Sequence, residues 1–226
     1  MATRRSQAGP AKAVIAPTIK LTLNGPAGPL EALRADPFAA TGGSSRGVAV
    51  IAHPHPLFGG TMENKVVQAL SRAFQHSGWS AVRFNFRGVG HSAGVYDEGR
   101  GELADMLAVV EQCAPNGPIA LAGFSFGAFV ASRAVEVLRG SRDIRRIVLI
   151  GTAASRFDVA PLPTDLHSRA LVIHGECDDT VPLIDVLNWA RPQDLPVTVL
   201  PGSGHFFHGQ LMLLRSLVSR HLDSTS

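Results

Sequence analysis

The chain has 226 residues, of which 45% are hydrophobic and 17% are charged, a composition typical of a globular protein that fits one domain. Its 21 basic and 18 acidic side chains leave a net charge of +3, and this small surplus gives no indication of a nucleic-acid partner. Two cysteines, Cys113 and Cys177, are too few for a disulfide framework. No apolar run approaches the roughly 20 residues of a membrane span, so no membrane association is expected.

Residues 1–17 lack the apolar core of a secretory signal, and we expect them to form a flexible N-terminal tail on a cytoplasmic protein. Residues 18–226 are then expected to form a single domain. The domain opens with residues 19–23, which alternate apolar and polar side chains as a half-buried strand does. Residues 30–35 follow a turn rich in glycine and are predicted to be the antiparallel partner of that strand.

After a Gly/Ser-rich loop at 41–47, the pattern alternates between strands and helices. The apolar run 47–53 is typical of a strand buried on both faces in a parallel sheet. Further strands are predicted at residues 81–86, 117–122, 144–150, 170–174 and 197–200. Helices are predicted near residues 63–77, 101–112, 128–139, 182–190 and 207–222. The pattern predicts a three-layer α/β/α sandwich with a mostly parallel sheet and an antiparallel N-terminal hairpin. The segment 151–168 is too short for a large cap domain, so we expect an open site.

Residues 123–127, Gly-Phe-Ser-Phe-Gly, have the form of a nucleophile elbow. They lie between the predicted strand 117–122 and the predicted helix 128–139. On such a turn the serine backbone is strained and its hydroxyl stands above the sheet edge, while a Cβ at either glycine would collide with neighbouring backbone. Ser125 is therefore the candidate nucleophile, and its plainer interpretation is a helix N-cap.

Two more polar side chains, Asp178 and His205, follow predicted strands. Active sites of open α/β sheets lie where loops leave the carboxyl ends of the strands, so we expect these side chains to act with Ser125. In that arrangement the imidazole takes the serine proton during attack on a carbonyl. The carboxylate orients the imidazole and stabilises the imidazolium that forms. Spacing alone leaves Asp179 and His208 as alternatives, and either aspartate could instead cap the helix near residue 182.

The segment 53–61, His-Pro-His-Pro-Leu-Phe-Gly-Gly-Thr, leaves the end of the first parallel strand. A tetrahedral intermediate carries a negative oxygen that needs two N–H donors. We expect these donors from Phe126, at the start of the helix after the elbow, and from Leu57. His53 and His55 could be read as a metal pair. Since no further ligand lies at suitable spacing, we expect no metal and a loop braced by these histidines.

Three apolar side chains near these loops are candidate walls of a substrate pocket: Phe58, Val89 and Phe206. Apolar residues at such places are as often plain core. Arg87, in the segment 85–92, could bind an anionic group of a substrate. Its plainer interpretation is an internal ion pair with Glu102 or Asp105.

Five segments in this order carry a family resemblance: residues 53–65, 83–92, 123–127, 174–182 and 202–208. Over about residues 18–222 the chain resembles the α/β-hydrolase superfamily. More narrowly, it is similar to small bacterial serine hydrolases related to the dienelactone-hydrolase and prolyl-oligopeptidase-type catalytic domains. The resemblance implies the α/β-hydrolase fold and places the acid on Asp178 and the base on His205. The chain departs from many relatives at His55-Pro56, where they carry His-Gly. It departs from dienelactone hydrolases proper at Ser125, where they carry cysteine.

We therefore expect a carboxylic-ester hydrolase that acts on small-molecule esters or thioesters through an acyl-enzyme, without metal or organic cofactor. One alternative is a peptidase or amidase of the prolyl-oligopeptidase kind, although such enzymes usually carry an added propeller or cap. Another is a hydrolase-fold protein that binds a ligand without chemistry, although all three residues of the expected triad are present. The oligomeric state is expected to be a monomer or a homodimer.

Overall fold

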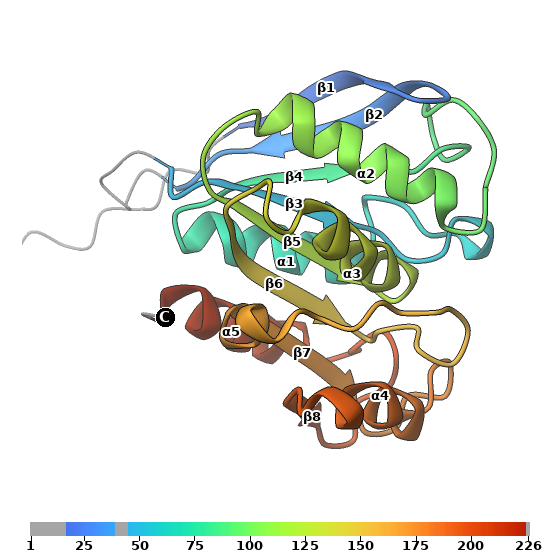
Figure 1. The fold of residues 1–226 in the computed structure, drawn as a ribbon, viewed down its shortest axis with the longest axis vertical. Coiled ribbons are helices and arrows are strands. Elements are labelled where there is room, and N and C mark those ends of the chain that lie inside the picture. The colour runs from blue at the N-terminus through green and yellow to red at the C-terminus, as the bar shows by residue number, and fades with distance from the viewer. Residues whose placement is uncertain (1–16, 39–44, 225–226) are drawn as a thin grey trace, which may run out of the picture.

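The computed structural model describes residues 17–38 and 45–224. Within these ranges, eight strands form one sheet in the order β1-β2-β4-β3-β5-β6-β7-β8 (Figure 1). The predicted N-terminal tail, apart from Pro17, and most of the predicted 41–47 loop lie outside the described residues. The strands are β1 (Thr18–Gly25), β2 (Gly28–Ala35), β3 (Val48–Ala52), β4 (Ser80–Phe84), β5 (Ile119–Phe124), β6 (Ile144–Ile150), β7 (Ala170–Gly175) and β8 (Val197–Leu200).

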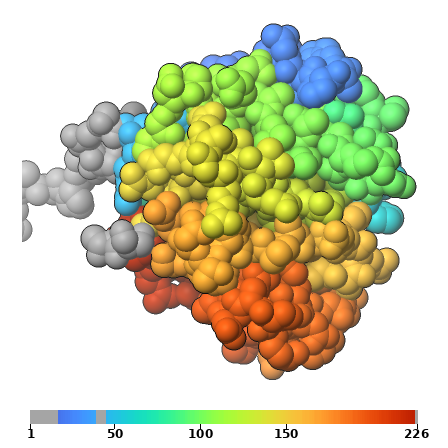
Figure 2. Space-filling model, in the orientation of Figure 1, coloured from blue at the N-terminus to red at the C-terminus, as the bar shows by residue number. Residues whose placement is uncertain are grey.

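The sheet is antiparallel at its start and parallel thereafter. β1 and β2 form the expected hairpin, and β2 also pairs antiparallel with β4. Every later pairing, from β4–β3 to β7–β8, is parallel. All six residues of β5 are buried, as expected for a central strand covered on both faces. The hairpin, in blue, lies at one end of the molecule, and α4 and β8, in orange, lie at the other (Figure 1 and Figure 2).

Helices cover both faces of the sheet and complete the predicted three-layer sandwich. The helices are α1 (Lys65–His76), α2 (Arg100–Cys113), α3 (Phe126–Leu138), α4 (Leu183–Ala190) and α5 (Leu211–Asp223). α1 and α5 pack together on one face, and α2 and α3 pack together on the other (Figure 1). In the described part of the chain, no helix combines the length and the apolar character needed to cross a bilayer.

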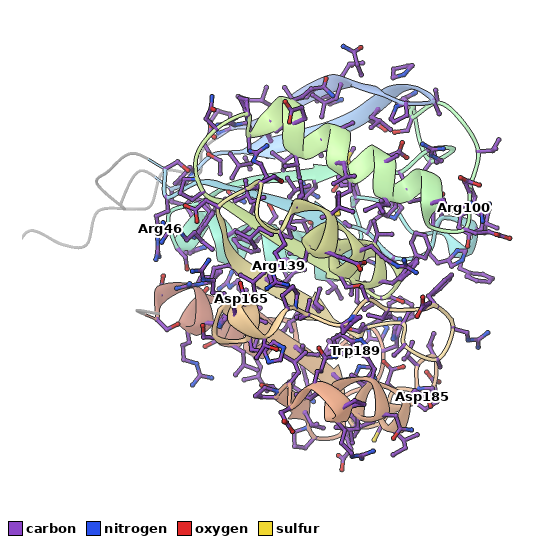
Figure 3. The ribbon with its side chains drawn as sticks, viewed as in Figure 1. Arg46, Arg100, Arg139, Asp165, Asp185 and Trp189 are labelled. Atoms are coloured by element: carbon purple, nitrogen blue, oxygen red, sulfur yellow. The ribbon has the colours of Figure 1, made fainter. Side chains whose placement is uncertain are left out.

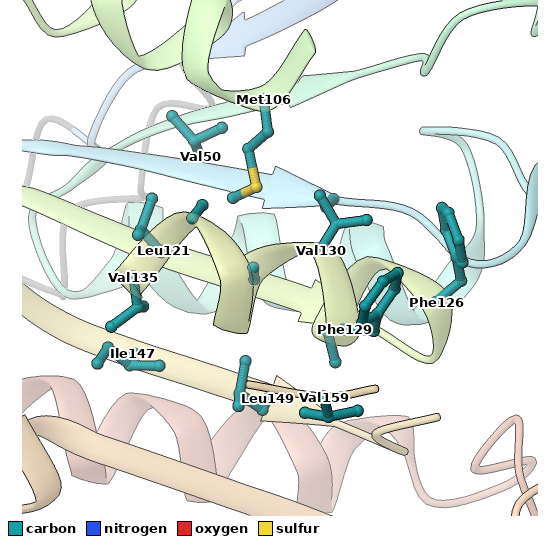
Figure 4. Close-up of a cluster of buried hydrophobic side chains, with 14 of the residues drawn as sticks. Val50, Met106, Leu121, Phe126, Phe129, Val130, Val135, Ile147, Leu149 and Val159 are labelled. Atoms are coloured by element: carbon teal, nitrogen blue, oxygen red, sulfur yellow. The ribbon is translucent and has the colours of Figure 1, made fainter. Parts of the chain in front are cut away.

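The core on the α2–α3 face fixes the position of β5 and of the turn that follows it. Figure 4 shows Met106 of α2 and Val130 of α3 among strand side chains such as Val50 and Leu121. Each of these four side chains is fully buried, and burial of one such side chain contributes about 1.5–3 kcal/mol. The start of α3 is therefore held rigidly against the sheet, which is what a strained turn requires.

The last helix begins later than the sequence pattern predicts, at Leu211 rather than near residue 207. Phe207 is fully buried and has a left-handed backbone with φ of 52°, a conformation that does not continue a helix. The N–H of Phe207 donates to the carbonyl of Gly204 at 3.1 Å, and the N–H of Gln210 donates to the carbonyl of Phe207 at 3.0 Å. Two successive turns therefore precede α5.

The segment between β6 and β7 forms no cap, as expected from its length. It contains only a short 3-10 helix, η3 (Thr164–Arg169). Arg139 at the end of α3 pairs with Asp165 at 2.7 Å (Figure 3). The indole of Trp189 in α4 donates to the carbonyl of Val159 at 3.1 Å. These contacts tie the segment to α3 and α4.

Candidate active site

Three loops meet at the carboxyl ends of the parallel strands. Ser125 follows β5, Asp178 lies in the loop after β7, and His205 lies in the loop after β8. β5, β6, β7 and β8 are consecutive neighbours in the sheet, so these loops emerge at the same edge. The structure thus brings together the three residues that the sequence singled out.

The turn at Ser125 has the strained geometry expected of an elbow. Ser125 has φ of 57° and ψ of −116°, a region that non-glycine residues rarely occupy. A Cβ on Gly123 would meet the backbone of Gly127, and a Cβ on Gly127 would meet the carbonyl of Ala52. Although Ser125 occupies the N-cap position of α3, its side chain makes no capping hydrogen bond. The N-cap interpretation therefore does not explain this side chain.

A chain of two hydrogen bonds links the three residues. The distance from Ser125 Oγ to His205 Nε2 is 3.1 Å, and the distance from His205 Nδ1 to Asp178 Oδ2 is 2.7 Å. All three residues are buried. With Nδ1 facing a carboxylate, the neutral imidazole carries its proton there, and Nε2 is free to accept the serine proton. The runner-up base, His208, is exposed and has its ring beside Phe206.

Asp178 is held as a carboxylate by hydrogen bonds. Burial raises its pKa, but the hydrogen bonds from His205 and from the N–H of Val181 outweigh that effect, and the net pKa lies below the usual value. Its Oδ1 accepts from the N–H groups of Thr180 at 3.0 Å and Val181 at 2.7 Å. Asp179 is exposed. Neither aspartate caps α4, whose N-cap is Pro182.

A second imidazole, His174, stands behind the carboxylate of Asp178. Its Nε2 lies 2.8 Å from the carbonyl of Val181 and 3.4 Å from Asp178 Oδ2. Burial lowers the pKa of His174, so the ring is neutral near pH 7 and its Nε2 proton faces these oxygens. Asp178 therefore lies between two imidazoles, of which only His205 also reaches Ser125.

The segment after β3 is braced by histidines, as expected. His53 is fully buried; its Nε2 accepts from the N–H of Phe86 at 3.1 Å, and its Nδ1 lies 2.6 Å from the carbonyl of Pro54. Burial lowers the pKa of His53 to about 4, so the ring is neutral. The N–H of Leu57 donates to Nδ1 of His55 at 3.2 Å. The amide that the sequence suggested as an oxyanion donor is therefore already engaged.

A cavity of about 560 Å³ opens beside Ser125 and His205. Two of the predicted pocket residues, Phe58 and Phe206, line it. Val89 does not line the cavity, because it is buried in a turn where its N–H donates to the carbonyl of Phe86 at 3.1 Å. The side chain of Leu57 does not line it either and is 65% exposed. The remaining lining residues are Pro54, His55, Gly59, Gly60, Asn64, Phe126, Ala153, Arg156, Phe157, Thr180 and Val181.

Sequence reasoning missed the contribution of residues 153–157, which follow β6. β6 lies next to β5 in the sheet, so the loop after β6 reaches the same edge as Ser125. Phe157 stacks on Phe129 with ring centroids 4.9 Å apart and contacts the ring of Phe126 at 5.1 Å. The sheet order, had it been known, would have placed this loop at the site.

Arg87 has a structural role. It forms a two-point ion pair with Asp105, at 3.0 Å from Nε and 2.8 Å from the terminal nitrogen, and does not line the cavity. Glu102 instead accepts from the N–H groups of Asp97 and Gly99. Across residues 17–38 and 45–224, no group of three or more histidine, cysteine or acidic side chains is placed to hold a metal ion.

Comparisons with known proteins agree with this architecture. A family model described as alpha/beta hydrolase fold matches residues 57–168. The chain is 35% identical to a serine hydrolase without a lid from Xanthomonas campestris, with a TM-score of 0.81, over 92% of this chain and 97% of that one. It is 37% identical to a serine hydrolase homologue from Coxiella burnetii, with a TM-score of 0.75, over 90% and 97% of the two chains. It is also 30% identical, over 83% of its own length and 82% of the other, to an uncharacterized protein of Rickettsia prowazekii. The chain therefore belongs to the α/β-hydrolase superfamily and has the fold of its serine hydrolases.

Proposed function

We propose that the protein is a serine hydrolase that cleaves carboxylic esters or thioesters of small to medium acyl groups. The observation that carries this proposal is the hydrogen-bonded chain from Ser125 through His205 to Asp178 beside an open cavity. The strained elbow supports it, since the Ser125 side chain makes no capping hydrogen bond, and the buried carboxylate of Asp178 supports it through its hydrogen bond with His205.

In this mechanism Ser125 Oγ attacks the carbonyl carbon while His205 Nε2 takes its proton. The tetrahedral intermediate collapses, the bond to the leaving oxygen or sulfur breaks, and the alcohol or thiol leaves with the proton from His205. Water then attacks the acyl-enzyme by the same route, which releases the acid and restores Ser125. Asp178 keeps His205 in the productive tautomer and stabilises its charged form.

The proposed oxyanion donors are the N–H groups of Phe126 and His55. Phe126 is the first residue of α3, so its N–H has no partner within the helix and benefits from the helix dipole. His55 lines the cavity, and its ring lies 5.0 Å from that of Phe126. Its N–H makes no hydrogen bond to any described residue. Because the N–H of Leu57 donates to the ring of His55, the backbone N–H of His55 is the better candidate for the second oxyanion donor.

The test of this proposal is labelling with a fluorophosphonate probe, which reacts with activated serines. We expect the probe to label the wild type and Ser141→Ala, a matched control at an exposed serine, and to leave Ser125→Ala unlabelled. Labelling of Ser125→Ala would assign the nucleophile elsewhere.

A substrate panel separates esterase from amidase activity. Esters, thioesters and a prolyl amide of comparable size are offered to the wild type, and we expect turnover of the first two classes. Faster turnover of the amide would favour a peptidase. If the probe labels nothing and no substrate is turned over, a protein that binds a ligand without chemistry would be favoured.

A further inference from the structure

Among the described residues, the lining of the cavity beside Ser125 is mostly apolar and includes one permanently charged side chain. Its lining includes the rings of Phe58, Phe126, Phe157 and Phe206, and it includes Arg156. Arg156 is exposed, and its guanidinium forms no ion pair or hydrogen bond with the described residues. Arginine always carries its charge and binds carboxylates through paired N–H donors. An unengaged guanidinium in the lining of this cavity is therefore suited to bind an anionic group.

The fold holds Arg156 at this position through its neighbour. The N–H groups of Arg156 and Phe157 both donate to the carbonyl of Ala153 at 3.2 Å, which closes a turn directly after β6. Phe157 is stacked on Phe129 and contacts the ring of Phe126. Phe126 follows Ser125 in the chain, so the Arg156 backbone is anchored to the same structure as the nucleophile.

Among the described residues, no acidic side chain lines the cavity, and two acids close in sequence to lining residues pair with other side chains. Asp158, two residues after Arg156, pairs with Arg133 of α3 at 2.9 Å. Glu63, next to the cavity residue Asn64, pairs with Arg83 at 3.0 Å. Because burial lowers the pKa of His55, this cavity histidine is neutral near pH 7 and adds no charge. No described lining residue therefore neutralises the positive charge of Arg156.

We propose that Arg156 selects substrates whose acyl group carries a carboxylate at its far end. This inference rests on the proposed function and narrows it to half-esters and half-thioesters of dicarboxylic acids. The apolar walls hold the methylene chain and the guanidinium holds the terminal carboxylate. Ser125 forms a bond to the acyl carbon as the alcohol or thiol leaves with a proton, and water then releases a dicarboxylic acid.

The experiment compares two substrates of similar length, mono-4-nitrophenyl adipate and 4-nitrophenyl heptanoate, after subtraction of the rate in buffer. The measured quantity is the ratio of kcat/KM for the charged ester to kcat/KM for the neutral ester. We expect Arg156→Gln to lower this ratio about fivefold, as for a partly exposed ion pair, and to change heptanoate hydrolysis less than about twofold. Arg156→Lys should restore part of the ratio. Arg72→Gln, an exposed arginine that does not line this cavity, removes the same net charge and should leave the ratio unchanged.

The dependence of this kcat/KM ratio on salt concentration gives a second test, which does not depend on how well the variant folds. Raising NaCl from about 0.02 M to about 0.5 M should lower the ratio in the wild type and leave it flat in Arg156→Gln. An unchanged ratio in Arg156→Gln, or an equal fall in Arg72→Gln, would overturn the inference and leave the proposed function standing. If the wild type hydrolyses neither ester, the proposed function itself fails.

Discussion

Two opposing effects act on the pKa of Asp178. Burial disfavours its charge, and hydrogen bonds from His205 and Val181 restore it, so that its pKa ends below the usual value. The neighbouring His174 and His205 therefore face a carboxylate rather than a carboxylic acid near pH 7. The carboxylate accepts a hydrogen bond from Nδ1–H of His205, so the ring proton stays on Nδ1 and Nε2 is unprotonated towards Ser125.

Replacing Asp178 by asparagine tests this role, because Asp179 offers the same change one residue away. In Asp178→Asn the amide nitrogen presented to Nδ1 favours the wrong imidazole tautomer. We expect kcat on a short-chain ester to fall by about 10³- to 10⁴-fold. Asp179→Asn, at an exposed position, should stay within about twofold of the wild type. Steady-state kinetics measure both, and the reverse ranking would move the acid to Asp179.

At this scale the sequence predicts the members of the hydrogen-bonded chain better than their surroundings. Ser125, Asp178 and His205 each follow a predicted strand, and carboxyl strand ends converge in any parallel sheet. The direction of one amide N–H depends on the conformation of its loop. The sequence predicts Leu57 as the second oxyanion donor, but in the structure its N–H donates a hydrogen bond to the ring of His55. Val89 failed as a pocket residue for a similar reason, since a local turn buries it.

The elbow, as an element, depends on two close backbone approaches. At Gly127 a Cβ would be driven into the carbonyl of Ala52 at the end of β3. We expect Gly127→Ala to lower the free energy of unfolding by about 1–3 kcal/mol or more. Urea denaturation followed by circular dichroism measures this. The control is Gly204→Ala, whose Cβ would meet only the carbonyl of Cys177 at 3.8 Å; an equal loss in the control would contradict the steric argument.

The order of elements follows from the sequence because apolar runs and helical periodicity are local signals. The start of α5 does not, because it depends on a tertiary contact. Phe207 continues the helical pattern in sequence, but its ring is buried and its backbone is left-handed. The helix consequently starts at Leu211. The burial of one aromatic ring thus outweighs local helix propensity over four residues.

His53 joins two strand ends and makes the fold sensitive to acid. The fold lowers its pKa from 6.5 to about 4, so between these values the unfolded chain binds more protons than the folded one. Stability should therefore fall as the pH drops from about 6.5 to about 4, by about 3 kcal/mol from this group. His53→Gln should be less stable at pH 7 and should lose less stability over this range. Urea denaturation at several pH values measures how the free energy of unfolding depends on pH in the wild type and in His53→Gln. An equal pH dependence in the two proteins would contradict the role given to His53.

At the scale of the whole molecule, the position of the segment between β6 and β7 leaves the cavity beside Ser125 open. The segment between β6 and β7 is tied to α3 by the ion pairs Arg139–Asp165 and Arg133–Asp158. Exposed ion pairs contribute little singly, but here two pairs and the Trp189 hydrogen bond act on one short segment. The segment consequently forms a wall of the cavity through Arg156 and Phe157 rather than a lid over it.

The open cavity beside Ser125 predicts how activity depends on the length of the acyl chain. The cavity of about 560 Å³ accommodates a short or medium chain, and additional methylenes would extend into water, where they gain no binding energy. We expect kcat/KM for neutral 4-nitrophenyl esters to rise from acetate to a medium chain and then to level off or fall. We also expect no jump in rate when a substrate exceeds its solubility, because no described segment covers the cavity as a lid that would have to open at an interface. Esters of graded length, assayed on both sides of the solubility limit, measure both effects. Continued rise to long chains, or activation by emulsion, would require an acyl tunnel or a moving segment that this arrangement does not provide.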